Sequence, residues 1–259
     1  MSDDGKVVSW EDAGPGVLVA TIDRRPANAL GPPIIDGLNA LLDEAERRDT
    51  RVLVLTSGIP GFFAAGADIK HLGTVDAESF AAYGDRLRGA VERLAEADLI
   101  SIAAVEGVAL GGGLELAMAC TMRVSGAEAK YGLPEVRLGL IPGAAGTQRL
   151  PRLVGRGRAI DIMATARQVP AEEAAAIGLV DRLVPAGEAA EAALVLAGQL
   201  SGLSWPALAA LIRTVDAAFD RPFHEGKRFE VEQIHELFVH GEAREGITAF
   251  LQKRPPKFG

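Results

Sequence analysis

The sequence predicts a mixed α/β fold that ends in a helical region. Short apolar runs rich in β-branched residues alternate with amphipathic segments through the first part of the 259-residue chain. The strand pattern fades beyond Gly139, and from Ala189 to Leu251 the spacing of apolar residues is helical. Strands alternating with helices are typical of α/β proteins, and a following run of helices indicates an added helical region.

Buried strands are expected where a short apolar run is bounded by turn residues. In chain order they are 16–22, 51–56, 99–105, 121–125, 130–132 and 180–184. Helices are expected where apolar residues recur at intervals of three and four, as within 79–97 at Phe80, Tyr83, Leu87, Val91 and Leu94. The other expected helices are 34–47, 114–119, 147–154, 158–164, 171–177 and then 189–251, with breaks near 201–206, 221–222 and 241.

This pattern divides the chain into a core domain at 1–200 and a C-terminal helical region at 201–259. A few helices cannot bury their apolar faces by themselves. We therefore expect 201–259 to pack on its own core or on another subunit.

Composition excludes several classes of protein. With 48% apolar and 24% charged residues, the chain can bury a large core, which excludes a disordered protein. A net charge of −8 disfavours broad electrostatic binding to nucleic acid. The single cysteine, Cys120, suits a reducing compartment, and the acidic start at 1–5 is unlike a signal peptide.

The apolar stretch 99–120 is long enough that a membrane-spanning helix must be considered. It carries two carboxylates, Glu106 and Glu115, and three consecutive glycines at 111–113. Charged groups at membrane depth are unfavourable, and the glycines would break a spanning helix. We therefore expect a cytoplasmic protein with no membrane segment.

Common metal, nucleotide and nucleophile motifs do not fit the sequence. His235 and His240 lie five residues apart, so on a helix they point about 140° away from each other and cannot share an ion. The chain contains neither G-x-x-x-x-G-K-[ST] nor G-x-S-x-G. Cys120 lies in an apolar helix end, where a thiol is more often inert than nucleophilic. No metal site is expected.

Two glycine-rich turns each follow a predicted strand. The segments 62–70 (FFAAGADIK) and 107–115 (GVALGGGLE) carry little bulk, which lets a ligand approach the backbone. One N–H group from each turn could converge on a negatively charged oxygen, as in an oxyanion hole. The alternative is that the glycines only permit tight turns between a strand and a helix.

Two glutamates stand among apolar neighbours. Glu115 lies in Leu-Glu-Leu-Ala-Met, and Glu135 follows 20 residues later in Leu-Pro-Glu-Val-Arg-Leu-Gly. A carboxyl group in apolar surroundings either has an ion-pair partner or has a raised pKa, which suits acid/base catalysis. The alternative for each glutamate is a buried cap or an ion pair, with Arg123, Arg137 and Arg149 as the possible partners. Together with two donor turns, the glutamates favour acid/base chemistry beside an activated carbonyl group.

These motifs, in this order, resemble the enoyl-CoA hydratase/isomerase (crotonase) superfamily. The resemblance covers essentially the whole chain and is closest to the hydratases of fatty-acid β-oxidation. It is carried by these segments: RPANAL at 25–30, AAGADIK at 64–70, ALGGGLE at 109–115, LPEVRLG at 133–139, IPGAAGTQRL at 141–150 and EGITAFLQKR at 245–254. Ala145 stands where many members have glycine.

The resemblance implies a spiral of ββα turns, with a C-terminal helical region that builds a homotrimer or a hexamer. It implies an acyl-CoA substrate and no separate cofactor. It assigns the main-chain N–H groups of Ala67 and Gly112 to an oxyanion hole, and Glu115 and Glu135 to the acid/base pair. The residues that it places near the substrate are Arg25, Ala65, Ala67, Asp68, Ile69, Lys70, Gly112 and Gly143.

The activity implied is that of an enoyl-CoA hydratase, a lyase of lipid metabolism. In this family Glu115 would mainly activate water, and Glu135 would deliver the proton at C2 of a 2-trans-enoyl-CoA. Isomerases of the family often keep only the equivalent of Glu135, so both glutamates favour a hydratase. A Δ3,Δ2-enoyl-CoA isomerase remains the alternative, as does a catalytically vestigial member that binds acyl-CoA or associates with RNA.

Overall fold

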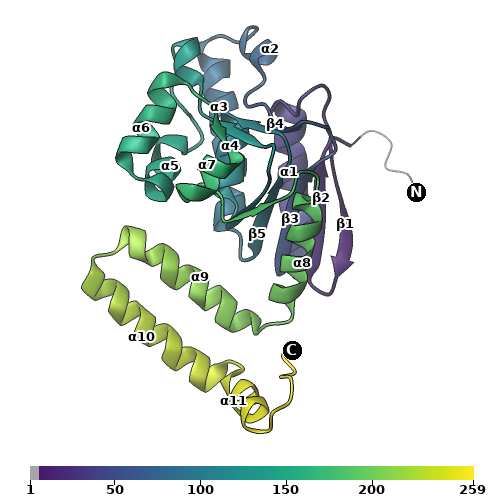
Figure 1. The fold of residues 1–259 in the computed structure, drawn as a ribbon, viewed down its shortest axis with the longest axis vertical. Coiled ribbons are helices and arrows are strands. Elements are labelled where there is room, and N and C mark those ends of the chain that lie inside the picture. The colour runs from purple at the N-terminus through teal and green to yellow at the C-terminus, as the bar shows by residue number, and fades with distance from the viewer. Residues whose placement is uncertain (1–5) are drawn as a thin grey trace. The chain divides into compact units, whose positions relative to one another are not determined.

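Six strands form the first sheet of the computed structural model, which describes residues 6–259. Their order is β1 (Val8–Gly14), β2 (Val17–Ile22), β3 (Val52–Ser57), β5 (Ile100–Val105), β7 (Met122–Gly126) and β10 (Arg182–Val184). β1 runs antiparallel to β2, and every later pair is parallel. Figure 1 shows β1, β2 and β3 side by side. The acidic start at 1–5 lies outside the described residues.

A second, smaller sheet has four strands. Its strands are β4 (Phe62–Ala64), β6 (Val108–Leu110), β8 (Lys130–Gly132) and β9 (Val169–Pro170). The first three are parallel, and β9 closes the sheet antiparallel to β8. Each of β3, β5 and β7 in the first sheet is therefore followed by a short strand in the second.

Helices complete these repeats. β4 leads to α2 (Ile69–Leu72) and α3 (Ala77–Glu96), and β6 leads to α4 (Gly112–Ala119). β8 leads to the short 3₁₀ helix η1 (Glu135–Leu138) and then to α5 (Gly146–Val154) and α6 (Arg156–Thr165). The remaining helices of this part are α1 (Pro32–Arg47) and α7 (Ala171–Ala176), with α8 beginning at Ala189. The predicted mixed α/β architecture is confirmed.

The core lies around the central strands of the first sheet. All six residues of β5 and the first four of β3 are buried. A strand buried on both faces reads as a continuous apolar run, which is why both strands could be predicted from the sequence. The apolar faces of α1 and α3 also belong to this core, through residues such as Leu38, Leu87 and Val91.

Four strands were missing from the sequence prediction. β1 has an exposed second half with the sequence Glu-Asp-Ala-Gly, so it carries no apolar run. β4 and β6 have three residues each, and β9 has two, which is too short for an alternating pattern to be visible. The predicted strand at 180–184 is also shorter, because β10 begins at Arg182.

The chain separates into two compact units between Ala197 and Gly198, within α8 (Ala189–Ser201). The second unit contains α9 (Trp205–Asp220), α10 (Phe223–His240) and α11 (Ala243–Leu251). The helix breaks agree with the predicted breaks near 201–206, 221–222 and 241. Within 6–259 no single helix is long and apolar enough to span a membrane, although one bent pair, α8 with α9, passes the same test when joined.

Candidate active site

Two turns meet at one edge of the second sheet. β4 and β6 are parallel neighbours, so the chain leaves both strands at the same end. From β4 it passes through Ala65, Gly66 and Ala67 into α2, and from β6 it passes through Gly111 into α4. The two glycine-rich segments singled out in the sequence therefore lie against each other.

The contact between the two turns leaves no room for side chains. A Cβ built on Gly113 would lie 2.1 Å from the Ala64 carbonyl oxygen, and a Cβ on Gly66 would lie 2.9 Å from the Leu110 carbonyl oxygen. Gly66 and Gly111 also have positive φ angles, 91° and 52°, which L side chains rarely adopt. Glycine at these positions allows α4 to begin directly against β4.

The N–H groups of Ala67 and Gly112 lie beside each other in this contact. The Ala67 nitrogen is 3.6 Å from the position that a Cβ on Gly112 would occupy. The Gly112 nitrogen is 3.5 Å from the position that a Cβ on Gly66 would occupy. No turn or loop hydrogen bond of residues 6–259 uses either N–H as its donor. Two main-chain donors are thus available to one acceptor, as an oxyanion hole requires.

A partly buried ion pair, Arg24 with Asp68, holds the first of these turns. Asp68 is 8% exposed and accepts a 2.7 Å bond from Nη2 of Arg24. Its other oxygen accepts the His71 N–H and so caps α2. Leu30 adds a main-chain bond of 2.8 Å to the Gly66 carbonyl. These bonds flank Ala67 on both sides and fix the orientation of its N–H group.

Glu115 lies in α4 with its carboxyl group buried, at 2% exposure. Oε1 accepts two main-chain bonds, from Ala144 at 2.7 Å and from Gly146 at 2.8 Å. Burial raises the pKa of Glu115, while these two bonds and the charge of Arg149 oppose the rise. One carboxyl oxygen is therefore fixed by the backbone, which orients the other.

Glu135 lies at the start of η1, next to the Gly111 turn. A Cβ on Gly111 would lie 2.9 Å from its Oε1, and its Oε2 is buried without a hydrogen-bond partner. Burial, with the negative charge of Glu115 as a further cause, raises the pKa of Glu135 to about 7. Glu135 can therefore exchange a proton near neutral pH, which suits a catalytic acid.

The raised pKa of Glu135 predicts a pH-dependent stability. Folding raises this pKa from 4.5 to about 7, so its stabilising contribution is complete below 4.5 and is lost as the pH rises through 7. Glu135→Gln has no such loss. We therefore compare the free energy of unfolding of Glu135→Gln with that of wild type at each pH. The difference, variant minus wild type, should be larger at pH 8 than at pH 5 by about 2 kcal/mol, a value reduced because the Glu135 side chain is partly exposed.

Urea unfolding of both proteins at the two pH values measures this difference. Glu128→Gln, at an exposed glutamate, is the control. A difference between Glu135→Gln and wild type that is the same at pH 5 and pH 8 would contradict the prediction.

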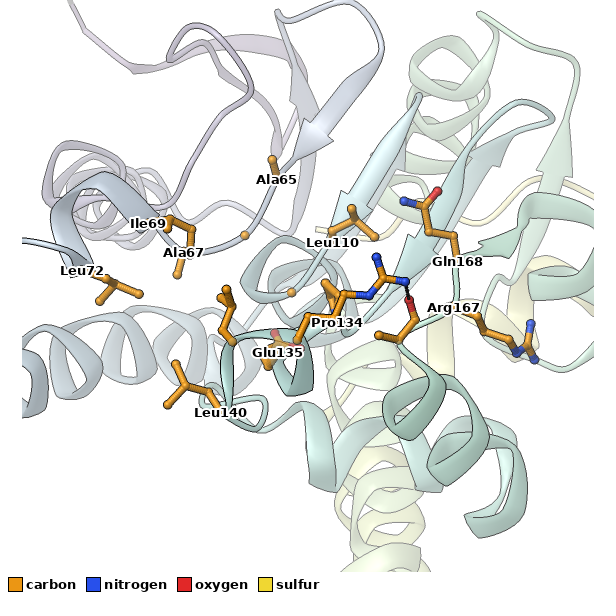
Figure 2. A pocket seen from close by; sticks show the side chains of 15 residues that line it. Ala65, Ala67, Ile69, Leu72, Leu110, Pro134, Glu135, Leu140, Arg167 and Gln168 are labelled. Carbon is orange, nitrogen blue, oxygen red and sulfur yellow. Dashed lines mark hydrogen bonds between the residues drawn. The ribbon is translucent and has the colours of Figure 1, made fainter.

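A pocket of about 440 Å³ opens beside Glu135. Figure 2 shows Ile69, Leu72 and Leu140 at one end, Arg167 and Gln168 at the other, and Glu135 with Leu110 between them. The predicted residues Ala65, Ala67 and Ile69 line this pocket. The sequence interpretation missed Leu72, Leu140 and Gln168, which lie in no motif, and it did not place Leu110 and Arg137 at the pocket although both lie in family motifs.

Besides Gly112, four residues expected near the substrate do not line the pocket: Arg25, Asp68, Lys70 and Gly143. Arg25 and Lys70 are exposed. Asp68 is occupied by Arg24 and by the α2 cap, and the Gly143 carbonyl accepts a 3.2 Å bond from Arg88. Gly112 is not in the lining either, although its neighbour Gly111 is.

The arginines considered as partners of the glutamates have other contacts. Arg123 is buried and binds Asp181 at 2.8 Å, so it holds β7 to the segment before β10. Arg149 pairs with Glu92 at 2.9 Å and acts on Glu115 only through its charge. Arg137 donates to the Ala166 carbonyl. The alternative that each glutamate is one half of an ion pair is wrong, but Glu115 does accept the N–H of Gly146, the first residue of α5, as a buried cap would.

Among residues 6–259 no group of three or more His, Cys, Asp or Glu side chains could hold a metal ion. His235 and His240 both lie on α10, where His240 faces Glu236 at 3.6 Å.

Comparison with known proteins identifies the family of this chain. A family model described as Enoyl-CoA hydratase/isomerase matches residues 12–259. A probable enoyl-CoA hydratase of Bacillus subtilis is 39% identical over 93% of this chain and 95% of its own length. One from Mycobacterium leprae is 36% identical over 93% of this chain and 94% of its own length.

Solved structures show the same fold. The crystal structure of an enoyl-CoA hydratase from Bacillus anthracis superposes with a TM-score of 0.93 at 33% identity, covering 97% of this chain and 98% of that one. A structure of Pseudomonas aeruginosa DspI gives a TM-score of 0.94 at 37% identity, covering 99% and 98%. The crotonase-like fold inferred from the sequence motifs is confirmed. The chain therefore belongs to the enoyl-CoA hydratase/isomerase family, the crotonase superfamily.

Proposed function

We propose that this protein is an enoyl-CoA hydratase, which adds water across the double bond of a 2-trans-enoyl-CoA to give a 3-hydroxyacyl-CoA. One observation carries the proposal. The buried carboxyl group of Glu115 contributes to the raised pKa of the half-buried Glu135, beside two main-chain N–H groups that no turn or loop hydrogen bond of residues 6–259 uses. Hydration of a conjugated thioester needs a base, an acid and an oxyanion hole together.

The N–H groups of Ala67 and Gly112 would bind the thioester oxygen. When water attacks C3, negative charge moves onto this oxygen as the thioester becomes an enolate. Removing one such donor in a comparable site costs about 3 to 4 kcal/mol of transition-state stabilisation. Ala65 and Ile69 line the pocket beside them.

The two carboxyl groups would divide the proton transfers. Glu115, with Oε1 fixed by Ala144 and Gly146, would accept a proton from the attacking water through its second oxygen. Glu135, with a pKa of about 7, would hold the proton that is delivered to C2. The reaction moves one water molecule and its protons only, so it requires no cofactor besides the coenzyme A of the substrate.

The direct test is the loss of the ultraviolet absorbance of crotonyl-CoA when purified protein is added. Fast loss, with 3-hydroxybutyryl-CoA identified by mass, is the expected result. Loss of a 3-enoyl-CoA with formation of its conjugated isomer, and no hydration, would replace the hydratase with an isomerase. Binding of acyl-CoA without turnover of either would indicate a vestigial member.

We further propose that the protein works in fatty-acid or related acyl-CoA degradation in the cytoplasm, and that it forms a homotrimer or a hexamer. On the single chain, α10 exposes large apolar side chains, including Phe223, Val231, Ile234, Phe238 and Val239. Exposed apolar surface of this extent is typical of a subunit interface.

The assembly predicts a mass of three or six times that of the 27.1 kDa chain in light scattering. The double variant Ile234→Glu, Phe238→Glu places two charges on this face and should reduce the assembly to smaller species. Glu232→Gln, an exposed change on the same helix, is the control and should not. An unchanged mass in the double variant would contradict an interface at α10.

A further inference from the structure

One end of the pocket is cationic, and the reaction proposed above does not use it. Arg137 of η1 lines the pocket two residues after Glu135. Its guanidinium donates one bond, from Nη2 to the Ala166 carbonyl oxygen at 3.1 Å, marked by the dashed line in Figure 2. Since a guanidinium has five N–H donors, most of them remain available.

The charge of Arg137 is not balanced by a carboxylate. Over residues 6–259 its one side-chain interaction is the bond to Ala166, which is neutral. Arg167 on the same wall differs, because it binds Asp161 at 2.7 Å and both oxygens of Glu173 at 2.7 and 3.0 Å. Arg167 is therefore neutralised within the protein, and Arg137 supplies the available positive charge at this end.

The side chain of Gln168 adds a neutral donor at the same end of the pocket. It is exposed, and no side-chain hydrogen bond occupies its amide in the described part of the chain. Figure 2 shows the Gln168 side chain on the same side of the pocket as Arg167, away from the apolar residues Ile69, Leu72 and Leu140. The pocket therefore has an apolar end and a polar end that can bind an anion.

We propose that Arg137, assisted by Gln168, binds a carboxylate at the end of the acyl chain, so that the enzyme accepts dicarboxylic enoyl-CoA thioesters. A planar guanidinium matches a carboxylate through two parallel hydrogen bonds. The phosphates of coenzyme A are the other source of negative charge. The phosphates carry more negative charge than one guanidinium beside a neutral amide would balance. Arg137 with Gln168 therefore matches a single carboxylate better than these phosphates.

This inference rests on the proposed function, since it names the substrate class of the same site. Saturated thioesters test recognition of the acyl end separately from hydratase activity, because they bind without being hydrated. The probes are glutaryl-CoA, which ends in a carboxylate, and butyryl-CoA, which ends in a methyl group. Their dissociation constants are measured by calorimetry for wild type, Arg137→Leu and Arg137→Lys.

Arg137→Leu should weaken glutaryl-CoA binding about tenfold or more and change butyryl-CoA binding less than about twofold. Arg137→Lys keeps the charge but not the planar fork, so its loss should be intermediate. Arg152→Leu is the matched control: Arg152 is also exposed and also donates to one main-chain carbonyl, that of Gln148, but it lies outside the pocket. It should leave both constants unchanged.

Equal weakening of both thioesters in Arg137→Leu would assign the arginine to a coenzyme A phosphate and overturn the proposal. An unchanged affinity for glutaryl-CoA would overturn it as well. If wild type hydrates crotonyl-CoA in either case, the proposed function stands and only this inference is wrong. If wild type binds neither thioester and does not hydrate crotonyl-CoA, both the inference and the proposed function are wrong.

Discussion

Replacing Glu115 or Glu135 by glutamine is expected to lower kcat for hydration of crotonyl-CoA by about 10²- to 10⁴-fold, the usual contribution of a positioned acid or base. Glutamine preserves the shape of the side chain but can neither accept the proton of water nor deliver one to C2. At position 115 the amide oxygen can still accept the N–H groups of Ala144 and Gly146, so the fold around it should persist.

Steady-state kinetics test this, with binding of butyryl-CoA as the check on the pocket. Affinity should stay within a fewfold of wild type, because the saturated thioester makes no proton transfer. Glu128→Gln, the same change at an exposed position, should retain full activity. If both active-site variants keep wild-type kcat, these glutamates are not the acid/base pair.

The pH profile distinguishes loss of an acid from a general disturbance. In wild type, kcat/KM should fall as the pH rises through about 7, where Glu135 loses its proton. On the acidic side it should fall as Glu115, whose pKa is also raised, becomes protonated. The residual activity of Glu135→Gln should lack the fall near 7. A fall that persists there would assign that titration to another group.

Gly113→Ala is expected to destabilise the fold by about 3 kcal/mol or more, at the upper end of what overpacking costs. The added Cβ would lie 2.1 Å from the Ala64 carbonyl oxygen, 2.7 Å from its carbonyl carbon and 2.8 Å from the Ala64 Cβ. Most of these atoms are main chain in β4, so they cannot rotate away as a flexible side chain could. Relief requires α4 to move off β4, which also separates the N–H groups of Ala67 and Gly112.

Urea unfolding at a fixed protein concentration measures the effect. Gly157→Ala is the matched control, since Gly157 lies in α6 and an added Cβ there meets nothing within 4 Å. That variant should be stabilised by about 0.5 to 1 kcal/mol, the helical preference for alanine over glycine. A change below that size for Gly113→Ala would show that the two turns can separate without cost.

Local sequence was informative where burial imposes a pattern. The central strands β3 and β5 are covered on both faces, so they read as continuous apolar runs. Helices α1 and α3 have one buried face, which repeats every three to four residues. β1, β4, β6 and β9 lack either pattern and were found only in the structure, whereas the three-residue strands β8 and β10 lie within the predicted ranges 130–132 and 180–184.

In the candidate site, too, some features follow from the sequence and others only from the tertiary structure. The sequence by itself determined the chemical groups: two glutamates in apolar surroundings and two glycine-rich turns after strands. Through the family motifs it also predicts that these groups act together. Only the tertiary structure decided what each group contacts. Glu115 accepts the N–H of a residue 29 positions away, and Asp68 binds an arginine 44 positions away instead of facing the pocket. Composition and periodicity report how deeply a residue is buried, whereas its partners depend on how distant segments are brought together by the packing of the two sheets.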